Sequence, residues 1–194
     1  MNKKEFIKKS FEDSSKIKIE TLKHCSSDIE KVSEVLVSCV RSGGKMMLCG
    51  NGGSAADCQH IATEFVIRLS HNLERPAIPA IALTTDTSNL TAGGNDIGFV
   101  NVFARSVEAL GRKGDCLIAI STSGNSVNII NAVNKAKAAG ITTIGLLGCE
   151  GGKIKPLCDF NIVIPTNDTQ RIQESHITVG HILCEIVERE LYEK

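Results

Sequence analysis

The sequence predicts an α/β fold: a doubly wound, mainly parallel five-stranded sheet flanked by helices, with a helical arm at the N-terminus. Five short apolar runs alternate with helix-like stretches from residue 45 onward. These runs are apolar throughout, which is typical of parallel strands that are covered on both faces. Strands that alternate with helices indicate an open, doubly wound sheet. The 194 residues suffice for one such domain, so we expect residues 1–194 to form a single unit.

Residues 1–44 are expected to form an arm of two helices outside the alternating region. A mixed apolar stripe indicates a first helix over residues 3–24. A second helix is predicted to begin at Ser27, because the Ser-Asp-Ile-Glu stretch there has the pattern of a capping box. Apolar residues recur at helical spacing over 29–40, and two glycines at 43–44 end the pattern. The arm either covers the sheet or provides an oligomerisation surface.

Residues 45–194 supply the sheet and the helices around it, ending in a long C-terminal helix. Strands are predicted at 45–49, 79–83, 116–121, 142–147 and 161–164. Helices are predicted near 54–69, 97–110, 126–139 and 171–192. Sheets of this kind bind ligands at the carboxyl ends of their strands. The loops that follow the strands are therefore the candidate binding loops.

The charge and composition argue against several classes of protein. The 22 basic and 22 acidic residues balance, which gives no electrostatic argument for nucleic acid or for an anionic membrane. No apolar run has the length of a transmembrane span, and the lysine-containing N-terminus lacks the apolar region of a signal peptide. The eight cysteines include no C-x-x-C pair. We expect them to be reduced and mainly structural, in a cytoplasmic protein.

The first candidate loop, residues 50–54 (Gly-Asn-Gly-Gly-Ser), joins the first strand to a helix. Its glycines allow close approach of a ligand, and a helix N-terminus suits an anion. The loop has a form of the dinucleotide fingerprint, but the acidic residue that should follow about twenty positions later is missing, so nicotinamide binding is not favoured. A P-loop is excluded, because no Gly-Lys-Ser/Thr follows the glycines. On the same helix, His60 and Glu64 are four residues apart and share a face. A general base or a metal site fits that pair.

The loop after the third strand, residues 121–126, reads Ser-Thr-Ser-Gly-Asn-Ser. Its four hydroxyls and free backbone amides can bind a phosphate without a lysine. Capping of the next helix requires only one serine or threonine, so phosphate binding is the favoured interpretation.

Two further stretches carry polar side chains of interest. The second loop ends at residues 93–96, where Asn95 and Asp96 either form a plain turn or bind a polyol. The last helix carries Gln173 and His181, eight residues apart on one face. A lone histidine on such a helix is more often a core residue than a catalyst.

Taken together, these residues resemble the phosphoheptose isomerases of the sugar-isomerase (SIS) domain family. The resemblance covers nearly the whole chain. It is carried by residues 50–54 with His60 and Glu64, by 94–96, by 121–126, and by 171–174 with His181. It implies a single SIS domain with a three-layer fold that converts sedoheptulose 7-phosphate to D-glycero-D-manno-heptose 7-phosphate through an enediol. That step leads toward the ADP- or GDP-activated heptoses of lipopolysaccharide core, capsule or S-layer glycan.

The resemblance also implies roles for individual residues. An enediol route needs a base for the carbon-bound proton and an acid for the oxygens, which would be Glu64 and His181. The phosphate would be bound by Ser121, Thr122, Ser123 and Ser126. The sugar would be bound by Asn51, Gly52, Gly53, Asn95, Asp96 and Gln173, with Glu64 also in contact.

The same resemblance implies a cytoplasmic homotetramer with active sites at subunit interfaces and often one zinc ion per subunit. The positions that match the metal ligands are His60, Glu64, Gln173 and His181. Zinc there would compete with the acid–base roles or replace them by polarising the carbonyl, and both alternatives stay open.

Two other functions remain open for this fold, because fold alone does not assign function. A non-catalytic sugar-phosphate-binding or regulatory protein, similar to the bacterial DnaA initiator-associating protein, would need the serine-rich loop but not Glu64 with His181. The other alternative is an isomerase of pentose or hexose phosphates, because nothing in the sequence measures the length of the sugar and only the resemblance favours a heptose.

Overall fold

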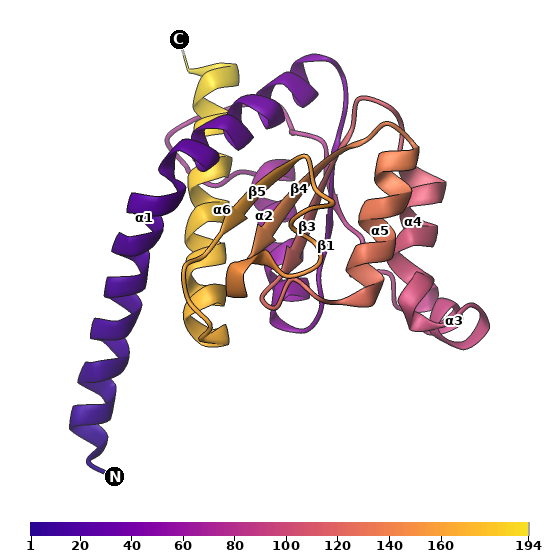
Figure 1. Ribbon diagram of the computed structural model, residues 1–194. Coiled ribbons are helices and arrows are strands. Elements are labelled where there is room, and N and C mark those ends of the chain that lie inside the picture. The colour runs from indigo at the N-terminus through magenta and orange to yellow at the C-terminus, as the bar shows by residue number, and fades with distance from the viewer. Residues whose placement is uncertain (194) are drawn as a thin grey trace.

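The computed structural model describes residues 1–193 and contains a five-stranded parallel sheet between two layers of helices (Figure 1). The strands are β1 (Met46–Cys49), β2 (Ala80–Ala82), β3 (Cys116–Ser121), β4 (Thr142–Leu147) and β5 (Phe160–Val163). Their order is β2-β1-β3-β4-β5, and every neighbouring pair is parallel. The predicted fold class is confirmed, and each predicted strand differs from the observed one by at most one residue at either end.

Six α-helices and two short 3-10 turns connect the strands. They are α1 (Lys3–Arg41), α2 (Gly53–Val66), α3 (Thr87–Asp96), η1 (Phe99–Asn101), α4 (Val102–Leu110), α5 (Val127–Ala138), η2 (Cys149–Gly151) and α6 (Thr169–Tyr192). Helices α1, α2 and α6 cover one face of the sheet, and α4 and α5 cover the other (Figure 1). Within residues 1–193, no helix is both long enough and apolar enough to cross a membrane.

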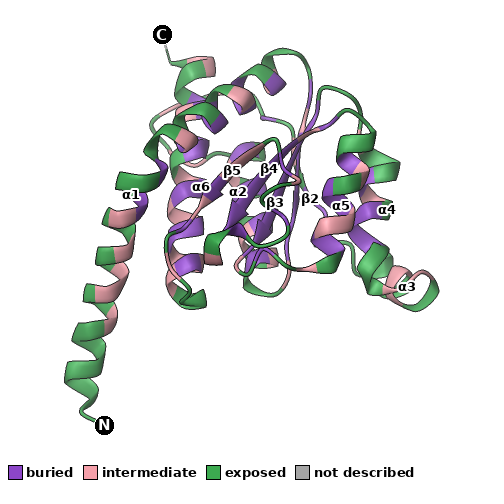
Figure 2. Ribbon diagram, viewed as in Figure 1, coloured by how far each residue is buried: buried purple, intermediate pink, exposed green. Residues whose placement is uncertain are grey.

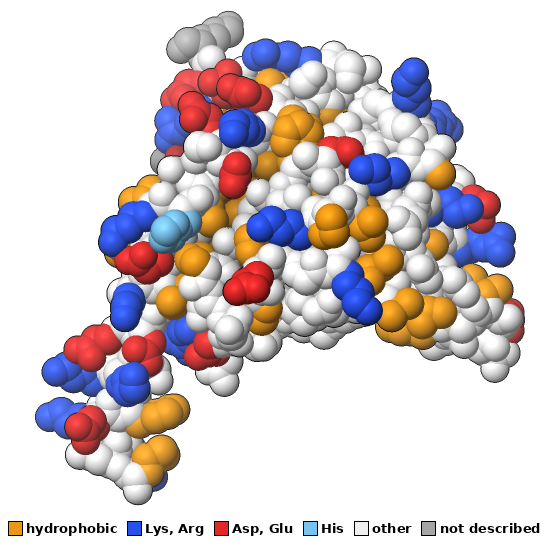
Figure 3. Space-filling model, in the orientation of Figure 1, with side chains coloured by type: hydrophobic (Ala, Val, Ile, Leu, Met, Phe, Trp, Pro, Cys, Tyr) orange, Lys and Arg blue, Asp and Glu red, His pale blue; other side chains and the backbone are white. Residues whose placement is uncertain are grey.

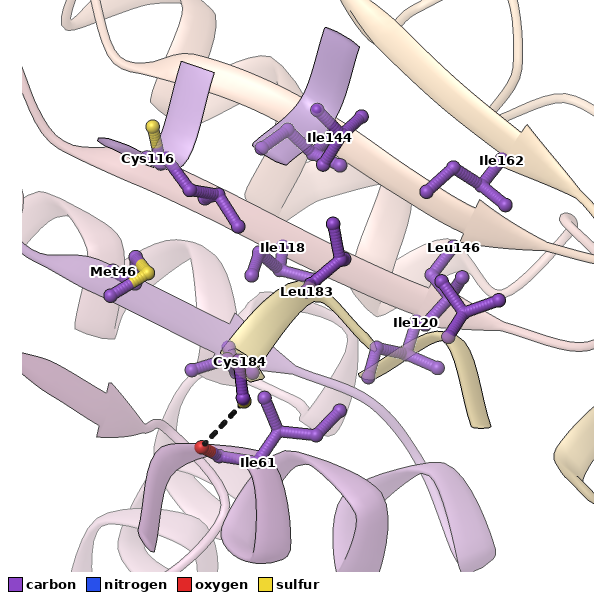
Figure 4. Close-up of a cluster of buried hydrophobic side chains, with 14 of the residues drawn as sticks. Met46, Ile61, Cys116, Ile118, Ile120, Ile144, Leu146, Ile162, Leu183 and Cys184 are labelled. Carbon is purple, nitrogen blue, oxygen red and sulfur yellow. Dashed lines mark hydrogen bonds between the residues drawn. The ribbon is translucent and has the colours of Figure 1, made fainter. Parts of the chain in front are cut away.

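The core lies on both faces of the sheet, which explains why the strands are apolar throughout. Successive side chains of a strand point to opposite faces. Met46 and Ile118 accordingly pack against the α1–α2–α6 layer, while Met47 and Leu117 pack against the α4–α5 layer. Figure 4 shows the first of these clusters, and Figure 2 shows the strands buried between the two layers. All eight cysteines are free, and only Cys149 is not buried.

The prediction of two N-terminal helices is wrong, because residues 3–41 form one continuous helix. Asn2 caps this helix by accepting a hydrogen bond from the N–H of Glu5. Ser27 lies inside the helix, because no glycine or proline interrupts this region and the buried stripe runs on from Cys25 to Ile29. Packing of that stripe against the domain outweighs the weak preference of Ser and Asp for helix ends.

The two halves of α1 have different surroundings. The half that follows Thr21 packs into the core, while the half before it is mainly exposed and extends beyond the domain, touching α6 where Arg171 donates to the Ser10 carbonyl at 2.6 Å (Figures 1 and 2). Along the projecting half, Phe6, Ile7 and Phe11 are exposed and give it an apolar side (Figure 3).

The loop predicted before residue 97 is largely a helix. Helix α3 begins after Asp86, whose carboxylate accepts a hydrogen bond from the N–H of Asn89 at 3.0 Å. Helix α4 starts only at Val102, later than predicted. The pattern was missed because two glycines indicated a turn, whereas Gly93 leaves room inside α3 for the side chain of Val102. Residues 95 and 96 therefore lie on the last turn of α3 rather than in a loop.

Candidate active site

The glycine-rich loop, residues 50–54, brings the chain tightly from β1 into α2. Gly52 has φ of 56° and ψ of −121°, a conformation that side chains other than hydrogen disfavour. At Gly53 a Cβ atom would collide with the carboxamide of Gln173 on α6. The N-terminus of α2 is thus held directly against α6, at the carboxyl edge of the sheet.

The side chain of Asn51 connects this loop to the start of α5. Its amide exchanges two hydrogen bonds with Asn128, at 2.9 Å and 2.8 Å. The Oδ1 atom of the buried Asn128 also accepts the N–H of Ile129 at 3.0 Å. Asn51 is predicted to orient the sugar, and in the structure it joins the glycine-rich loop to the start of α5. Asn128 was missed, because a single asparagine after a helix start has no distinctive signal.

The serine-rich loop, residues 121–126, is shaped by its own side chains. Ser121 Oγ accepts the N–H of Gly124 at 3.1 Å and lies 3.3 Å from Ser126 Oγ. Ser123 Oγ accepts the N–H of Asn125 at 3.2 Å, and Asn125 returns a bond to the Ser123 carbonyl at 2.8 Å. The loop ends at the N-terminus of α5, where backbone N–H groups lack helical partners and favour an anion.

The turn after β4 supports the serine-rich loop from the side. The N–H of Ile154 donates to the Gly124 carbonyl at 2.9 Å, and the N–H of Lys153 donates to Asn125 Oδ1 at 3.1 Å. This turn contains Cys149 and Glu150 with φ of 49° and 62°, which is unusual for residues with side chains. Such strained residues cluster at functional sites. No pattern in the sequence indicated them.

A second cluster of polar side chains joins α2 to α6. His60 Nε2 lies 2.8 Å from His181 Nε2 and 3.3 Å from Glu64 Oε1. One donor atom from each of the three residues lies within 4.8 Å of the others. The helices approach closely because Gly180 leaves its space to Ile61. Three of the residues predicted for the site are thus brought together from two distant parts of the chain.

A buried ion pair holds the end of α2 below this cluster. The guanidinium of Arg75 is fully buried against the carboxylate of Glu188, with Nε 2.7 Å from Oε1. The same guanidinium donates to the main-chain carbonyl of Glu64 at 2.7 Å. Breaking a buried pair of this kind is costly because it leaves an uncompensated charge. Arg75 therefore positions the peptide that carries Glu64, and no sequence pattern indicated it.

The other predicted sugar-binding residues lie elsewhere in the chain. Gln173 is eight residues before His181, which corresponds to about 12 Å along α6. Its amide faces the glycine-rich loop at Gly53. Asn95 and Asp96 are on α3, which packs with α4 and η1 and not in the layer of α2 and α6 (Figure 1). Their side chains are hydrogen-bonded to each other at 2.7 Å.

His176 is a core residue rather than a member of the cluster. It is completely buried, and its Nε2 is 3.1 Å from the carbonyl oxygen of Leu147 at the end of β4. Burial lowers the pKa of His176 to about 4, so the ring is neutral and Nε2–H donates to that oxygen. Its Nδ1 has no partner. His176 thus fastens α6 to the sheet.

The three-residue cluster has the donor set of a catalytic zinc site. Two imidazole nitrogens and one carboxylate oxygen are a known combination for that metal. Tetrahedral coordination with bonds of ~2.0–2.1 Å places donor atoms about 3.3 Å apart. The His60–Glu64 separation of 3.3 Å matches this spacing, and the His60–His181 separation of 2.8 Å is somewhat shorter. The residues therefore fit zinc, with Gln173 two helical turns from His181 along the same helix.

Known proteins that are similar to this chain show the class of protein to which it belongs. The family model described as "SIS domain" matches residues 10–148. The phosphoheptose isomerase of Clostridium acetobutylicum is 52% identical over 191 residues, covering 97% of this chain and 96% of that protein. Phosphoheptose isomerase structures also match, from Francisella tularensis (TM-score 0.93, 37% identity, 97% and 100% coverage) and Neisseria gonorrhoeae (TM-score 0.89, 42% identity, 95% and 97% coverage). The chain belongs to the phosphoheptose isomerase family of SIS-domain proteins.

Proposed function

We propose that this chain is an aldose–ketose isomerase that converts sedoheptulose 7-phosphate to D-glycero-D-manno-heptose 7-phosphate. The observation that carries the proposal is the cluster of His60, Glu64 and His181, in a chain that also carries a loop suited to phosphate at residues 121–126. A pure binding protein needs the loop but has no use for a carboxylate and imidazoles in contact. High identity to phosphoheptose isomerases supports the same function.

In the proposed mechanism Glu64 moves the carbon-bound proton. Its carboxylate accepts the proton from C1 of the ketose and returns it to C2, with an enediol between the two steps. His181 donates a proton to the carbonyl oxygen at C2 and accepts one from the hydroxyl at C1. His60 contacts the side chains of both Glu64 and His181 and holds them in position relative to each other. The side chain of Glu64 is only 16% exposed, which limits exchange of the abstracted proton with solvent.

The serine-rich loop would bind the phosphate through Ser121, Thr122, Ser123 and Ser126 and through the N-terminus of α5. The part of the sugar between the phosphate and the reacting carbons would be bound by Asn51, Gly52, Gly53, Asn95, Asp96 and Gln173. The glycine-rich loop and the His60 cluster are about 10 Å apart along α2, because Gly53 and His60 are seven residues apart on that helix.

Zinc is the metal that the cluster suits best, with one ion per subunit. His60, Glu64 and His181 would hold it, whereas Gln173, the further ligand that the family resemblance implies, lies about 12 Å from His181 along α6 with its amide against Gly53. When bound, zinc would polarise the carbonyl of the substrate. Metal analysis of the purified protein tests this: we expect one zinc per chain, lost in the His181→Ala variant. Absence of zinc from an active enzyme would leave the acid–base roles to the side chains alone.

A homotetramer with active sites between subunits would explain two features of the chain. Phe6, Ile7 and Phe11 expose apolar surface on the projecting half of α1. Asn95 and Asp96 lie in a different layer from the His60 cluster, so a second copy can bring them to it. Light scattering of the intact chain should report a tetramer, and deletion of residues 2–20, which make few core contacts, should reduce it to smaller species.

A coupled assay with sedoheptulose 7-phosphate tests the function directly. We expect turnover with this substrate and little with pentose or hexose phosphates. Tight phosphate-sugar binding without turnover would favour the regulatory alternative. The product would serve synthesis of nucleotide-activated heptose in the cytoplasm, for lipopolysaccharide or capsule.

A further inference from the structure

A pair of cysteines lies at the edge of the sheet opposite the binding loops. Cys39 is near the C-terminal end of α1, and Cys116 is the first residue of β3. The serine-rich loop follows the other end of the same strand. The isomerase mechanism uses neither cysteine, and both belong to the buried cluster under α1.

The two cysteines meet at one main-chain carbonyl. Cys39 Sγ donates to the oxygen of Lys45 at 3.6 Å, and the N–H of Cys116 donates to the same oxygen at 3.0 Å. A Cβ atom on Gly44 would collide with Cys39 Sγ on one side and with the carbonyl of Gly114 on the other. The end of α1 is thus pressed against the start of β3. Both cysteine side chains also line one surface depression, so the two thiols are neighbours.

The two neighbouring thiols differ in acidity. The neighbouring Cys116 side chain lowers the pKa of the Cys39 thiol, against the opposing effect of burial. The neighbouring Cys39 side chain, together with burial, raises the pKa of the Cys116 thiol. Because the thiolate is the reactive form, Cys39 is the better nucleophile of the pair.

A small molecule can approach the pair from the surface. Cys39 and Cys116 both line a depression of about 360 Å³, which also touches Ser38, Ser42 and Gly114. Each cysteine is at most 5% exposed, so the depression excludes bulky reagents. A hydroperoxide is small enough to enter.

We propose that Cys39 and Cys116 are a modification site that a hydroperoxide converts to a disulfide. The Cys39 thiolate attacks one peroxide oxygen, the O–O bond breaks, and hydroxide leaves, which gives a sulfenic acid on Cys39. The Cys116 sulfur then attacks the Cys39 sulfur, and the sulfenic hydroxyl leaves as water with the Cys116 proton. In sum, two thiols lose two hydrogens and one hydrogen peroxide becomes two waters.

The disulfide fastens the end of α1 to the sheet. It closes a loop from residue 39 to residue 116, and long closed loops restrict the unfolded chain most. We therefore expect oxidation to raise Tm by on the order of 5 °C. Isomerase activity should not change, because the pair lies at the edge of the sheet away from residues 121–126.

The test treats the native, full-length protein with hydrogen peroxide, blocks remaining thiols by alkylation, and maps peptides by mass spectrometry. The expected result is a Cys39–Cys116 cross-link that dithiothreitol removes, together with the rise in Tm. Cys39→Ser keeps a donor for the Lys45 carbonyl, and Cys116→Ala stays small and apolar, so both variants should fold. Neither should show the cross-link or the rise in Tm.

Cys25→Ser is the matched control, because Cys25 is buried on the same helix and bonds only the Val163 carbonyl at 3.2 Å. This variant should retain both effects. The proposal is overturned if peroxide gives no Cys39–Cys116 peptide in the folded protein, or if the cross-link forms only in urea. It is equally overturned if both Cys39→Ser and Cys116→Ala keep the peroxide-dependent change in Tm.

Discussion

The serine-rich loop and the His60–Glu64–His181 cluster are built in different ways. The loop is shaped by hydrogen bonds within residues 121–126 and from the adjacent turn at 153–154. The cluster joins two helices whose residues are 121 positions apart in sequence, and it depends on the close packing of Gly180 against Ile61. The loop is a local structure, whereas the cluster is a product of tertiary packing.

The two parts should therefore tolerate different changes. Loss of one hydroxyl from the loop should remove one interaction with the phosphate and leave the other hydrogen bonds of the loop in place. The cluster, in contrast, should respond to any change that moves α6 relative to α2, even one that touches none of its three side chains. Kinetic constants distinguish the two parts, because substitutions in the loop should change KM and substitutions in the cluster should change kcat.

The largest effect is expected from Glu64→Gln, which keeps the shape of the side chain and removes the base. We expect kcat to fall by at least ~10² while KM changes little. Glu185→Gln is the control, because Glu185 is an exposed carboxylate on α6 that pairs with Arg189. Steady-state kinetics with sedoheptulose 7-phosphate measure both. Turnover near that of the unchanged enzyme would remove Glu64 from its proposed role.

The next effect concerns stability, through the His176 contact that fastens α6 to β4. Its pKa is lowered by burial from 6.5 to about 4, so the unfolded chain binds the extra proton between these values. The contribution to the free energy of unfolding is complete above pH 6.5 and is lost as pH falls toward 4. At ~1.4 kcal/mol per pH unit, the loss amounts to about 3 kcal/mol.

Urea unfolding at pH 7 and pH 4.5 measures this loss. His176→Gln keeps a donor for the Leu147 carbonyl but does not titrate, so its stability should depend less on pH over this range. His24→Gln, at an exposed position on α1, should retain the full dependence. Equal pH dependence in all three proteins would show that His176 is not responsible.

A comparable effect on binding is expected for the loop. Ser123→Ala removes an exposed hydroxyl, and Ser121→Ala removes the acceptor for the N–H of Gly124. A lost hydrogen bond to a charged group costs ~1.5–3 kcal/mol, or roughly ten- to a hundredfold in KM, with kcat nearly preserved. Ser106→Ala, whose hydroxyl bonds only its own helix, serves as the control. Unchanged KM in both loop variants would place the phosphate elsewhere.

The smallest effect should come from Gly180→Ala, which alters the packing of α6 on α2 without changing any side chain of the cluster. The added Cβ would collide with Ile61 and push α6 away from α2. We expect kcat to fall about tenfold, with competitive inhibition by inorganic phosphate unaffected because the loop does not depend on this contact. The double variant Gly180→Ala, Ile61→Val should recover part of the loss. A change in phosphate affinity instead of kcat would show that the two parts are not independent.

The same contrast explains what the sequence could predict. The strands were located to within a residue because burial on both faces makes them uniformly apolar, and the loop at 121–126 is a contiguous motif. The pairing of His60 with Glu64 follows from helical spacing alone. The contact with His181, the links through Asn128 and Arg75, and the strained turn at Cys149 and Glu150 depend on packing between distant segments.

Two elements were misread for a related reason. Helix α1 was divided at Ser27 because a capping pattern is a local signal, and burial of the continuous stripe through Cys25 and Ile29 overrides it. Helix α3 was missed because two glycines indicate a turn unless a neighbour fills the space they leave. At Gly93 that neighbour is Val102. Local patterns therefore predicted the elements well where tertiary packing agreed with them.

The most direct test of the account is isomerisation of sedoheptulose 7-phosphate in deuterated water, followed by NMR of the aldose product. If Glu64 moves the proton through an enediol, part of the abstracted proton exchanges with solvent, and deuterium appears at C2 of the product. The Glu64→Gln variant should form this deuterated product at least ~10² times more slowly. Formation of the deuterated aldose by the Glu64→Gln variant at the rate of the unchanged enzyme would contradict the proposed role of Glu64 as the base.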